Sequence, residues 1–371
     1  MNKPKVLIFS LAYMPFIGGA EIAISEIANR LSNFEFHVIT ANLDSQQKST
    51  EKINNLTVHR VKNKYLYPWQ ACKLAQKLHA QNNYSIVWAM MATWGGWAAL
   101  KFKEKNPAVK YLLTLQSGDS DKFIQARTWF WNKRYKQIYS KADHVQVISK
   151  WLAKRAKKYG YTGDISLVPN GTNLPTNNKQ LTTNNKNERI ILTVSRLVKK
   201  NGIEDLIKAF YILNTKYNIL NTKLQIIGVG KLETKLKNLA QKLNISNKVE
   251  FLGKKNYSEI EKYYAQADIF VRPSLSEGFG NVFIEAMAHN IPVIGTPIGG
   301  IPDFLIENET GWFCQPNNPQ SIAEKIKYIL DEKNKDKVNQ VIAHAKKMVQ
   351  EKYTWDSVAQ KMNLIFNSLL K

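Results

Sequence analysis

The stretch DIFVRPSLSEGFGNVFIEAMAH, residues 268–289, joins a strand-length apolar run, a glycine-flanked turn and a helix-length segment. We expect a strand over residues 268–273 and a helix over residues 281–289. A helix that begins beside Gly280 points its unpaired backbone N–H groups and the positive end of its dipole toward the end of the strand. Such a helix terminus is suited to binding a diphosphate.

Two glutamates belong to this strand–turn–helix segment. Glu277 would stand on the loop and face a bound ligand. Glu285 would lie one turn into the helix, where its side chain leans back toward the N-terminus and comes within reach of a ribose hydroxyl pair. The alternative is that both side chains are ordinary solvated carboxylates, which is the usual state of a glutamate.

The length and the periodicity of the chain predict two domains. A chain of 371 residues can form two domains of ordinary size. Strand-length apolar segments alternate with amphipathic helices, as at 6–10 and 21–31 or at 223–227 and 232–243, so we expect parallel sheets covered by helices. The stretch 172–188, rich in Asn, Thr and Lys, is the predicted linker. The fold class is therefore α/β, with two doubly wound, Rossmann-like domains facing each other across a cleft.

Cysteines, histidines and apolar segments give little sign of a metal or a membrane span. Cys72 and Cys314 are too few and too isolated for a disulfide framework or a metal site. The six histidines lack metal-ligand spacing, so no catalytic metal is expected. The apolar run after Lys5 has only the length of a strand and no signal-peptide cleavage site, so we expect no signal peptide. The uncharged stretch 86–100 is shorter than the roughly 20 residues of a membrane span. We expect a cytoplasmic protein.

The whole chain has a formal net charge of +24, and its positive charge is concentrated in one segment. Residues 122–158 hold eleven Lys or Arg and one acidic residue, Asp143. Aromatic residues lie between them, namely Phe123, Trp129, Phe130, Trp131, Tyr135, Tyr139 and Trp151. This composition suits binding to an anionic bilayer surface, where each cation contributes about 1 kcal/mol to the binding free energy. A solvated basic helix with core aromatics is the alternative. Nucleic acid is not expected, because no known binding motif is present.

Short motifs are distributed along almost the whole chain. They are PFIGGAE at 15–21, VPNG at 168–171, TVSRL at 193–197, FLG at 251–253, SEGFG at 276–280, EAMA at 285–288, PVI at 292–294, Thr296, Gly299-Gly300 and Pro302-Asp303. In this order they resemble the retaining glycosyltransferases of family 4, and residues 271–305 closely resemble the donor-binding motif of that family. The resemblance implies the GT-B fold. We expect an acceptor-binding domain at 1–171, a donor-binding domain at 189–352, and a C-terminal helix at about 353–371 that packs back on the first domain.

The resemblance also implies the roles of individual residues. Arg196 would pair with the diphosphate through its guanidinium fork, Glu277 would bind sugar hydroxyls, and Glu285 would bind the ribose. The expected donor site comprises Gly19, Arg196, Lys200, Asn201, Gly228, Gly230, Glu277, Gly278, Phe279, Gly280, Asn281 and Glu285. The expected acceptor site comprises Gly18, Gln116 and Asp119. Glu277, Arg196 and Asp119 are the expected catalytic residues.

The chain departs from the family pattern at two positions. Where the family places a lysine five residues after the arginine, this chain has Asn201, preceded by Lys200. Either Lys200 reaches the phosphate, or Asn201 gives a weaker, uncharged contact. Where many members have a histidine near the acceptor, this chain has Gln116. A glutamine cannot act as a base, whereas Asp119 could. In a front-face retaining transfer, the departing phosphate can itself accept the proton.

Two short segments of the chain look like motifs of other protein classes. Asp119-Ser120-Asp121 spells the Asp-x-Asp of metal-dependent transferases, and Gly228-Val229-Gly230-Lys231 lacks the spacer of a phosphate loop. We predict a retaining, metal-independent hexosyltransferase without a cofactor. It would move a sugar from a nucleotide diphosphate sugar to a lipid-linked or saccharide acceptor, such as a glycolipid or a polysaccharide precursor, at the inner face of the cytoplasmic membrane. The alternatives are a catalytically weak nucleotide-sugar binding protein and a GT-B epimerase.

Overall fold

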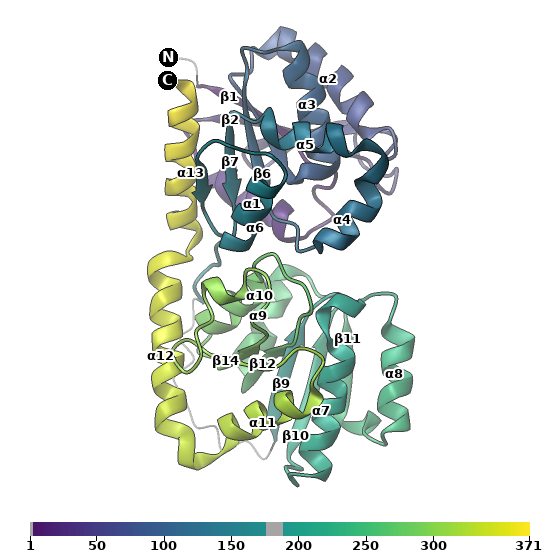
Figure 1. Cartoon of the computed structure of the whole chain (residues 1–371), viewed down its shortest axis with the longest axis vertical. Coiled ribbons are helices and arrows are strands. Elements are labelled where there is room, and N and C mark those ends of the chain that lie inside the picture. Colours follow the sequence, from purple (N-terminus) through teal and green to yellow (C-terminus); the bar gives the residue numbers. More distant parts are fainter. Residues whose placement is uncertain (1–2, 176–187) are drawn as a thin grey trace. The chain divides into compact units, whose positions relative to one another are not determined.

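The chain divides into two compact units, shown with their elements in Figure 1. The computed structural model describes residues 3–175 and 188–371. Unit 1 comprises Met1–Gly171 with Trp355–Lys371, and unit 2 comprises Thr172–Thr354. Most of the predicted linker, residues 176–187, lies outside the described residues.

Within the described residues, unit 1 is built on an eight-stranded sheet of order β3-β4-β2-β1-β5-β6-β7-β8. The strands are β1 (Lys5–Phe9), β2 (Glu35–Ala41), β3 (Thr50–Ile53), β4 (Leu56–Val61), β5 (Ile86–Met90), β6 (Lys110–Leu115), β7 (His144–Val147) and β8 (Ile165–Leu167). The β3–β4 pair is antiparallel and the others are parallel. Val6 to Phe9 are fully buried on both faces of β1, which requires helices on both sides of the sheet.

The helices of unit 1 supply this cover. They are α1 (Gly19–Arg30), α2 (Tyr67–Asn82), α3 (Gly96–Lys105), α4 (Asp121–Thr128), α5 (Asn132–Ser140), α6 (Lys150–Lys158) and α13 (Trp355–Leu370). The C-terminal helix α13 lies beside the sheet of unit 1 (Figure 1). Phe366 of α13 packs edge-on against Trp88 of β5, at a ring-centroid distance of 5.4 Å, and Asp356 accepts a 2.7 Å hydrogen bond from Arg30 of α1.

In the described part of unit 2 the strands form one six-stranded parallel sheet of order β11-β10-β9-β12-β13-β14. The strands are β9 (Arg189–Val194), β10 (Thr222–Ile227), β11 (Val249–Gly253), β12 (Ile269–Arg272), β13 (Val293–Gly295) and β14 (Trp312–Phe313). The helices are α7 (Ile203–Thr215), α8 (Glu233–Lys242), α9 (Tyr257–Gln266), α10 (Asn281–Ala288), α11 (Pro319–Leu330) and α12 (Lys335–Lys352). The carboxyl ends of neighbouring parallel strands lie at one edge, which is where ligands bind in such sheets.

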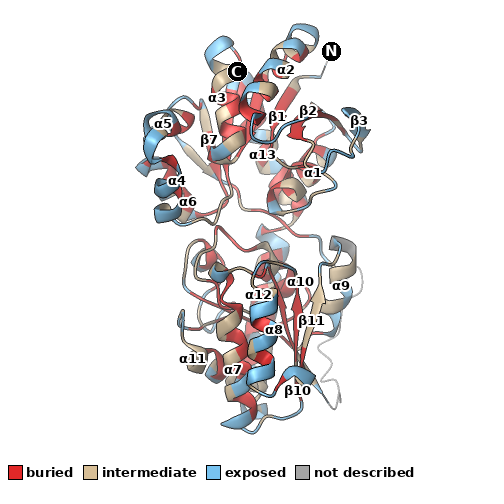
Figure 2. Ribbon diagram, turned by 90° about the vertical axis from the view of Figure 1, so that its right-hand side faces the viewer, coloured by how far each residue is buried: buried red, intermediate tan, exposed pale blue. Residues whose placement is uncertain are grey.

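The distribution of burial agrees with the expected α/β layers. Figure 2 shows buried residues along the strands and on the helix faces toward them, with exposed residues on the outer helix faces. The strand and helix expected around the Gly280 turn are present as β12 and α10. Cys72 and Cys314 are free and buried, as expected of small apolar residues. Across residues 3–175 and 188–371, every helix is too short or too polar to cross a membrane.

Candidate active site

Two glycine positions bring the loops after β9 and β10 into direct contact. Gly228 has a φ of +132°, and a Cβ there would lie 1.9 Å from the Ser195 carbonyl oxygen. A Cβ at Gly230 would lie 2.4 Å from the Leu197 carbonyl oxygen. Glycine is therefore required at both positions, because any side chain would separate the two backbones. Arg196 lies between these contacts with its side chain exposed at the carboxyl edge of the sheet.

A short 3-10 turn, η3 (Lys199–Asn201), is fixed to the end of β12. Gly202 has a φ of +69°, and a Cβ there would lie 2.0 Å from the Pro273 carbonyl oxygen. The Leu275 N–H donates a 2.6 Å hydrogen bond to the Lys200 carbonyl. Asn201 is 1% exposed, and its amide donates to the Arg196 carbonyl at 2.6 Å. The Asn201 amide thus helps to hold the loop that carries Arg196.

Arg272, the last residue of β12, joins this turn to Glu277. Its guanidinium donates a 3.3 Å hydrogen bond to Asn201 Oδ1 and lies 2.6 Å from Glu277 Oε2. The contact with Glu277 is an ion pair, and Glu277 Oε2 has no hydrogen-bond partner among the described residues. Arg272 was not among the expected site residues. The sequence could have indicated Arg272 as a site residue, because it is a charged residue that ends an otherwise apolar strand.

Glu277 is held at both ends of the residue. Its Oε1 accepts a 3.1 Å hydrogen bond from the Gly278 N–H, and its carbonyl accepts a 3.2 Å bond from the Gly300 N–H. A Cβ at Gly299, whose φ is +63°, would lie 1.9 Å from the same carbonyl oxygen. The Glu277 side chain is 16% exposed. The alternative of an ordinary solvated carboxylate is therefore wrong for Glu277.

Glu285 is buried within α10, with 8% of the residue exposed. Tyr264 of α9 donates a 2.8 Å hydrogen bond to its Oε2, and the tyrosine ring stacks on His289 at a centroid distance of 5.2 Å. Burial raises the pKa of Glu285 from 4.5 to about 7, although the Tyr264 hydrogen bond and the Arg272 charge act in the opposite direction. The solvated alternative is wrong for Glu285 as well. Its carboxylate faces Tyr264, a partner that the sequence did not indicate.

The turn between the two glutamates contributes backbone groups to the site. Gly280 is the N-cap residue of α10, with a φ of +102°, and Asn281 is its first residue. Phe279 is buried, and its ring packs on Phe304 at 4.9 Å and on Tyr353 at 5.7 Å. Its side chain therefore belongs to the core of unit 2, which leaves its backbone for contact with a ligand.

In unit 1, Gly18 and Gly19 begin α1, with Gly18 as the N-cap residue. A Cβ at Gly18 would lie 2.7 Å from Glu21 Oε2. Burial raises the pKa of Glu21, while hydrogen bonds from the backbone N–H groups of Glu21 and Gly18 oppose the rise. The Glu21 carboxylate therefore caps the amino end of α1, as acidic residues in a first turn commonly do.

Gln116 and Asp119 lie on the loop after β6. The Asn170 amide, from the VPNG motif, donates a 3.1 Å hydrogen bond to Gln116 Oε1. Asp119 Oδ2 accepts a 3.0 Å bond from Ser117 Oγ. Asp121 instead pairs with Arg155, at 3.1 Å. No group of three His, Cys, Asp or Glu side chains that could hold a metal occurs within the described ranges.

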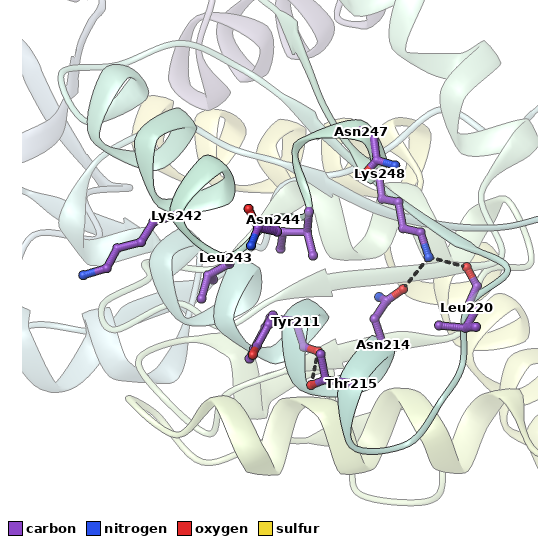
Figure 3. A pocket seen from close by; sticks show the side chains of 10 residues that line it. Tyr211, Asn214, Thr215, Leu220, Lys242, Leu243, Asn244, Asn247 and Lys248 are labelled. Carbon is purple, nitrogen blue, oxygen red and sulfur yellow. Dashed lines mark hydrogen bonds between the residues drawn. The ribbon is translucent and has the colours of Figure 1, made fainter.

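The expected site residues thus fall into two groups. The donor-site residues from Arg196 to Glu285 lie in unit 2, whereas Gly18, Gly19, Gln116 and Asp119 lie in unit 1. A surface pocket of about 470 Å³ in unit 2 lies apart from the unit 2 group, at the amino ends of β10 and β11 (Figure 3). Lys248, which lines this pocket, donates 2.8 Å hydrogen bonds to Asn214 Oδ1 and to the Leu220 carbonyl.

Comparison with known sequences decides the family. The profile described as Glycosyltransferase Family 4 matches residues 17–175, and the profile described as Glycosyl transferases group 1 matches residues 176–364. The chain belongs to glycosyltransferase family 4. An uncharacterized glycosyltransferase of Methanocaldococcus jannaschii is 27% identical to this glycosyltransferase over 373 residues, or 98% of each chain. A capsular polysaccharide biosynthesis glycosyltransferase of Staphylococcus aureus is 32% identical over 184 residues, 49% of this chain and 47% of the relative.

Solved structures confirm the expected GT-B fold of this glycosyltransferase. Sucrose-phosphate synthase from Thermosynechococcus elongatus matches with a TM-score of 0.85 and 22% identity, over 99% of each chain. Anabaena HepE, solved in complex with UDP-glucose, matches with a TM-score of 0.79 and 18% identity, over 98% of this chain and 99% of HepE.

The basic segment 122–158 of this family 4 glycosyltransferase divides into buried and exposed parts. Trp129 and Phe130 are 77% and 72% exposed, whereas Tyr135 and Tyr139 are buried core residues. Three of the segment's eleven cations pair with acidic residues that lie outside the segment. These pairs are Arg134 with Glu104, and Arg155 and Lys158 with Asp121.

Proposed function

We propose that this glycosyltransferase is a retaining, metal-independent enzyme that moves a hexose from a nucleotide diphosphate sugar to a glycolipid or polysaccharide-precursor acceptor. The observation that carries the proposal is Glu277, whose side chain is anchored and only 16% exposed on the turn before α10, near the edge where Arg196 is exposed. The match to a capsular polysaccharide glycosyltransferase supports the acceptor class, and the UDP-glucose complex of HepE supports the donor class.

The chemistry follows from the charges that develop during transfer. The bond between the anomeric carbon and the diphosphate oxygen breaks, and negative charge grows on the diphosphate. The Arg196 guanidinium and the N–H groups at the start of α10 stabilise this charge. The acceptor oxygen bonds to the anomeric carbon from the same face. Its proton passes to the departing phosphate or to Asp119, because the Gln116 amide cannot take it.

Glu277 and Glu285 have different parts in this scheme. Glu277, fixed by Arg272 and the Gly278 N–H, accepts hydrogen bonds from sugar hydroxyls. Glu285 accepts hydrogen bonds from the ribose hydroxyls while its carboxylate also accepts the hydrogen bond from Tyr264. Mutation of Glu277 therefore acts on turnover, and mutation of Glu285 acts on nucleotide binding.

A screen of nucleotide diphosphate sugars tests the proposal. A ligand at 100 times its dissociation constant stabilises the folded protein by about 2.7 kcal/mol, which a thermal-shift assay detects. A stabilising donor should then be transferred, or slowly hydrolysed when no acceptor is present. Arg196→Gln should abolish stabilisation by the donor, whereas Lys242→Gln should not, because Lys242 lies on an exposed part of α8 away from the site. Donor binding without release of sugar would favour the binding protein, and an epimerised sugar would favour the epimerase.

The location that we propose is the inner face of the cytoplasmic membrane, where the enzyme docks as a peripheral protein. Support comes from the exposed Trp129 and Phe130, which can enter a headgroup layer, and from the neighbouring cations Arg127, Lys133 and Lys136, which are exposed.

Flotation with vesicles tests this location. Replacing Arg127, Lys133 and Lys136 by Ser should release the protein from vesicles that contain phosphatidylserine, and raised salt should do the same. The matched control replaces the exposed Lys235, Lys237 and Lys242 of α8 by Ser, with the same loss of charge. Equal binding of both variants, or binding that ignores lipid charge, would refute membrane docking through this segment.

A further inference from the structure

We propose that Arg272 is a positioning residue that carries, on β12, the positive charge that the family places at position 201, so that Asn201 and Arg272 function as one interdependent pair. The inference rests on the proposed function of Glu277. It begins from the placement of one guanidinium, which contacts Asn201 Oδ1 at 3.3 Å and Glu277 Oε2 at 2.6 Å. Arg272 therefore links the turn after Arg196 to the residue that binds the sugar.

Backbone packing fixes position 201 beside Arg272. Gly202 touches the Pro273 carbonyl so closely that no Cβ fits, and the Leu275 N–H donates to the Lys200 carbonyl. The amide nitrogen of Asn201 donates a hydrogen bond to the Arg196 carbonyl. A residue at 201 consequently cannot withdraw from Arg272 without moving the end of β12.

Burial decides which side chains this arrangement allows. Asn201 is 1% exposed and the Arg272 side chain is 12% exposed. With Asn201, one guanidinium nitrogen of Arg272, Nη2, meets both a neutral acceptor and the Glu277 carboxylate. A lysine at 201 would bring a second cation to a poorly solvated guanidinium, and like charges in such a place repel strongly. The site accommodates one cation here, and Arg272 already supplies it.

This pairing reverses the simple expectation for Asn201→Lys. From the sequence, a restored lysine should strengthen diphosphate binding. With Arg272 present, the same lysine should weaken the site, and it should be accepted when Arg272 is replaced by methionine, which keeps an unbranched apolar side chain without the charge. The effects of the two substitutions should therefore be strongly non-additive.

A double-mutant cycle tests the pairing in the full-length protein. The four proteins are wild type, Asn201→Lys, Arg272→Met and the double variant, and Asn247→Lys, on an exposed turn, controls for an added lysine. Thermal midpoint, calorimetric UDP affinity, kcat and donor KM are measured for each. Asn201→Lys should lower the thermal midpoint and lower kcat at least tenfold. Arg272→Met should lower kcat at least tenfold with donor KM within threefold, since Glu277 loses its anchor.

The double variant decides the outcome. We expect its thermal midpoint to exceed that of Asn201→Lys. We also expect its kcat to be at least tenfold higher than the value obtained when the fold reductions of the two single variants are multiplied. Independent effects of the two substitutions, or an Asn201→Lys protein that equals or surpasses wild type, would overturn the pairing. If wild type transfers no sugar, the proposed function fails, while the thermal midpoints still decide whether the two positions are coupled.

Discussion

The raised pKa of Glu285 makes the stability of unit 2 depend on pH in a defined direction. In the unfolded chain this carboxyl ionises near 4.5, whereas in the folded protein burial raises its pKa to about 7. Below pH 4.5 the group is neutral in both states and has no effect. Between pH 4.5 and 7 the folded state binds more protons than the unfolded state, so the free energy of unfolding falls as pH rises.

The size of this loss follows from the pKa difference. At about 1.4 kcal/mol per pKa unit, the rise from 4.5 to about 7 corresponds to about 3 kcal/mol, fully expressed above pH 7. Glu285→Gln removes the ionisation and keeps an oxygen that can accept the Tyr264 hydrogen bond. The variant should therefore gain about 3 kcal/mol relative to wild type between pH 4.5 and pH 8.

Urea unfolding of wild type and Glu285→Gln at pH 4.5, 6, 7 and 8 measures this gain. Comparing two proteins at each pH cancels the titration of every other group. Glu309→Gln, an exposed glutamate of the same unit, is the matched control and should follow wild type throughout. A constant difference between Glu285→Gln and wild type from pH 4.5 to 8 would refute the reasoning, because it would place the folded-state pKa of Glu285 near its ordinary value.

Three further predictions concern the bound states and turnover. Binding of UDP at pH 6.5 should release part of a proton, since hydroxyl donors favour the ionised Glu285, and calorimetry in buffers of different ionisation enthalpy should find this release absent in Glu285→Gln. Glu277→Ala should lower kcat at least about 100-fold while UDP affinity stays within a few fold, and equal losses in both would contradict its role on the sugar. A chelator should leave transfer intact, whereas activity restored only by magnesium or manganese would refute the metal-independent mechanism and direct attention to Asp119 and Asp121.

The elements and the turn of the donor-site segment could be predicted from the sequence. The strand and helix expected at 268–273 and 281–289 agree with β12 and α10 to within one residue at each end. Apolar runs, glycines and helix starts are local signals, because each depends on neighbours in the chain. The same holds for Gly280, whose positive φ is the backbone conformation that a glycine most readily adopts.

The environment of each charged side chain was decided by the tertiary structure. Arg272 meets Asn201 from 71 positions away, and Tyr264 meets Glu285 from 21 positions away. In the basic segment, Tyr135 and Tyr139 are buried while Trp129 and Phe130 are exposed, although all four lie within eleven residues. Burial and partner charges set a pKa or the availability of an amide. Both depend on which distant segments pack together, and that information is absent from local sequence patterns.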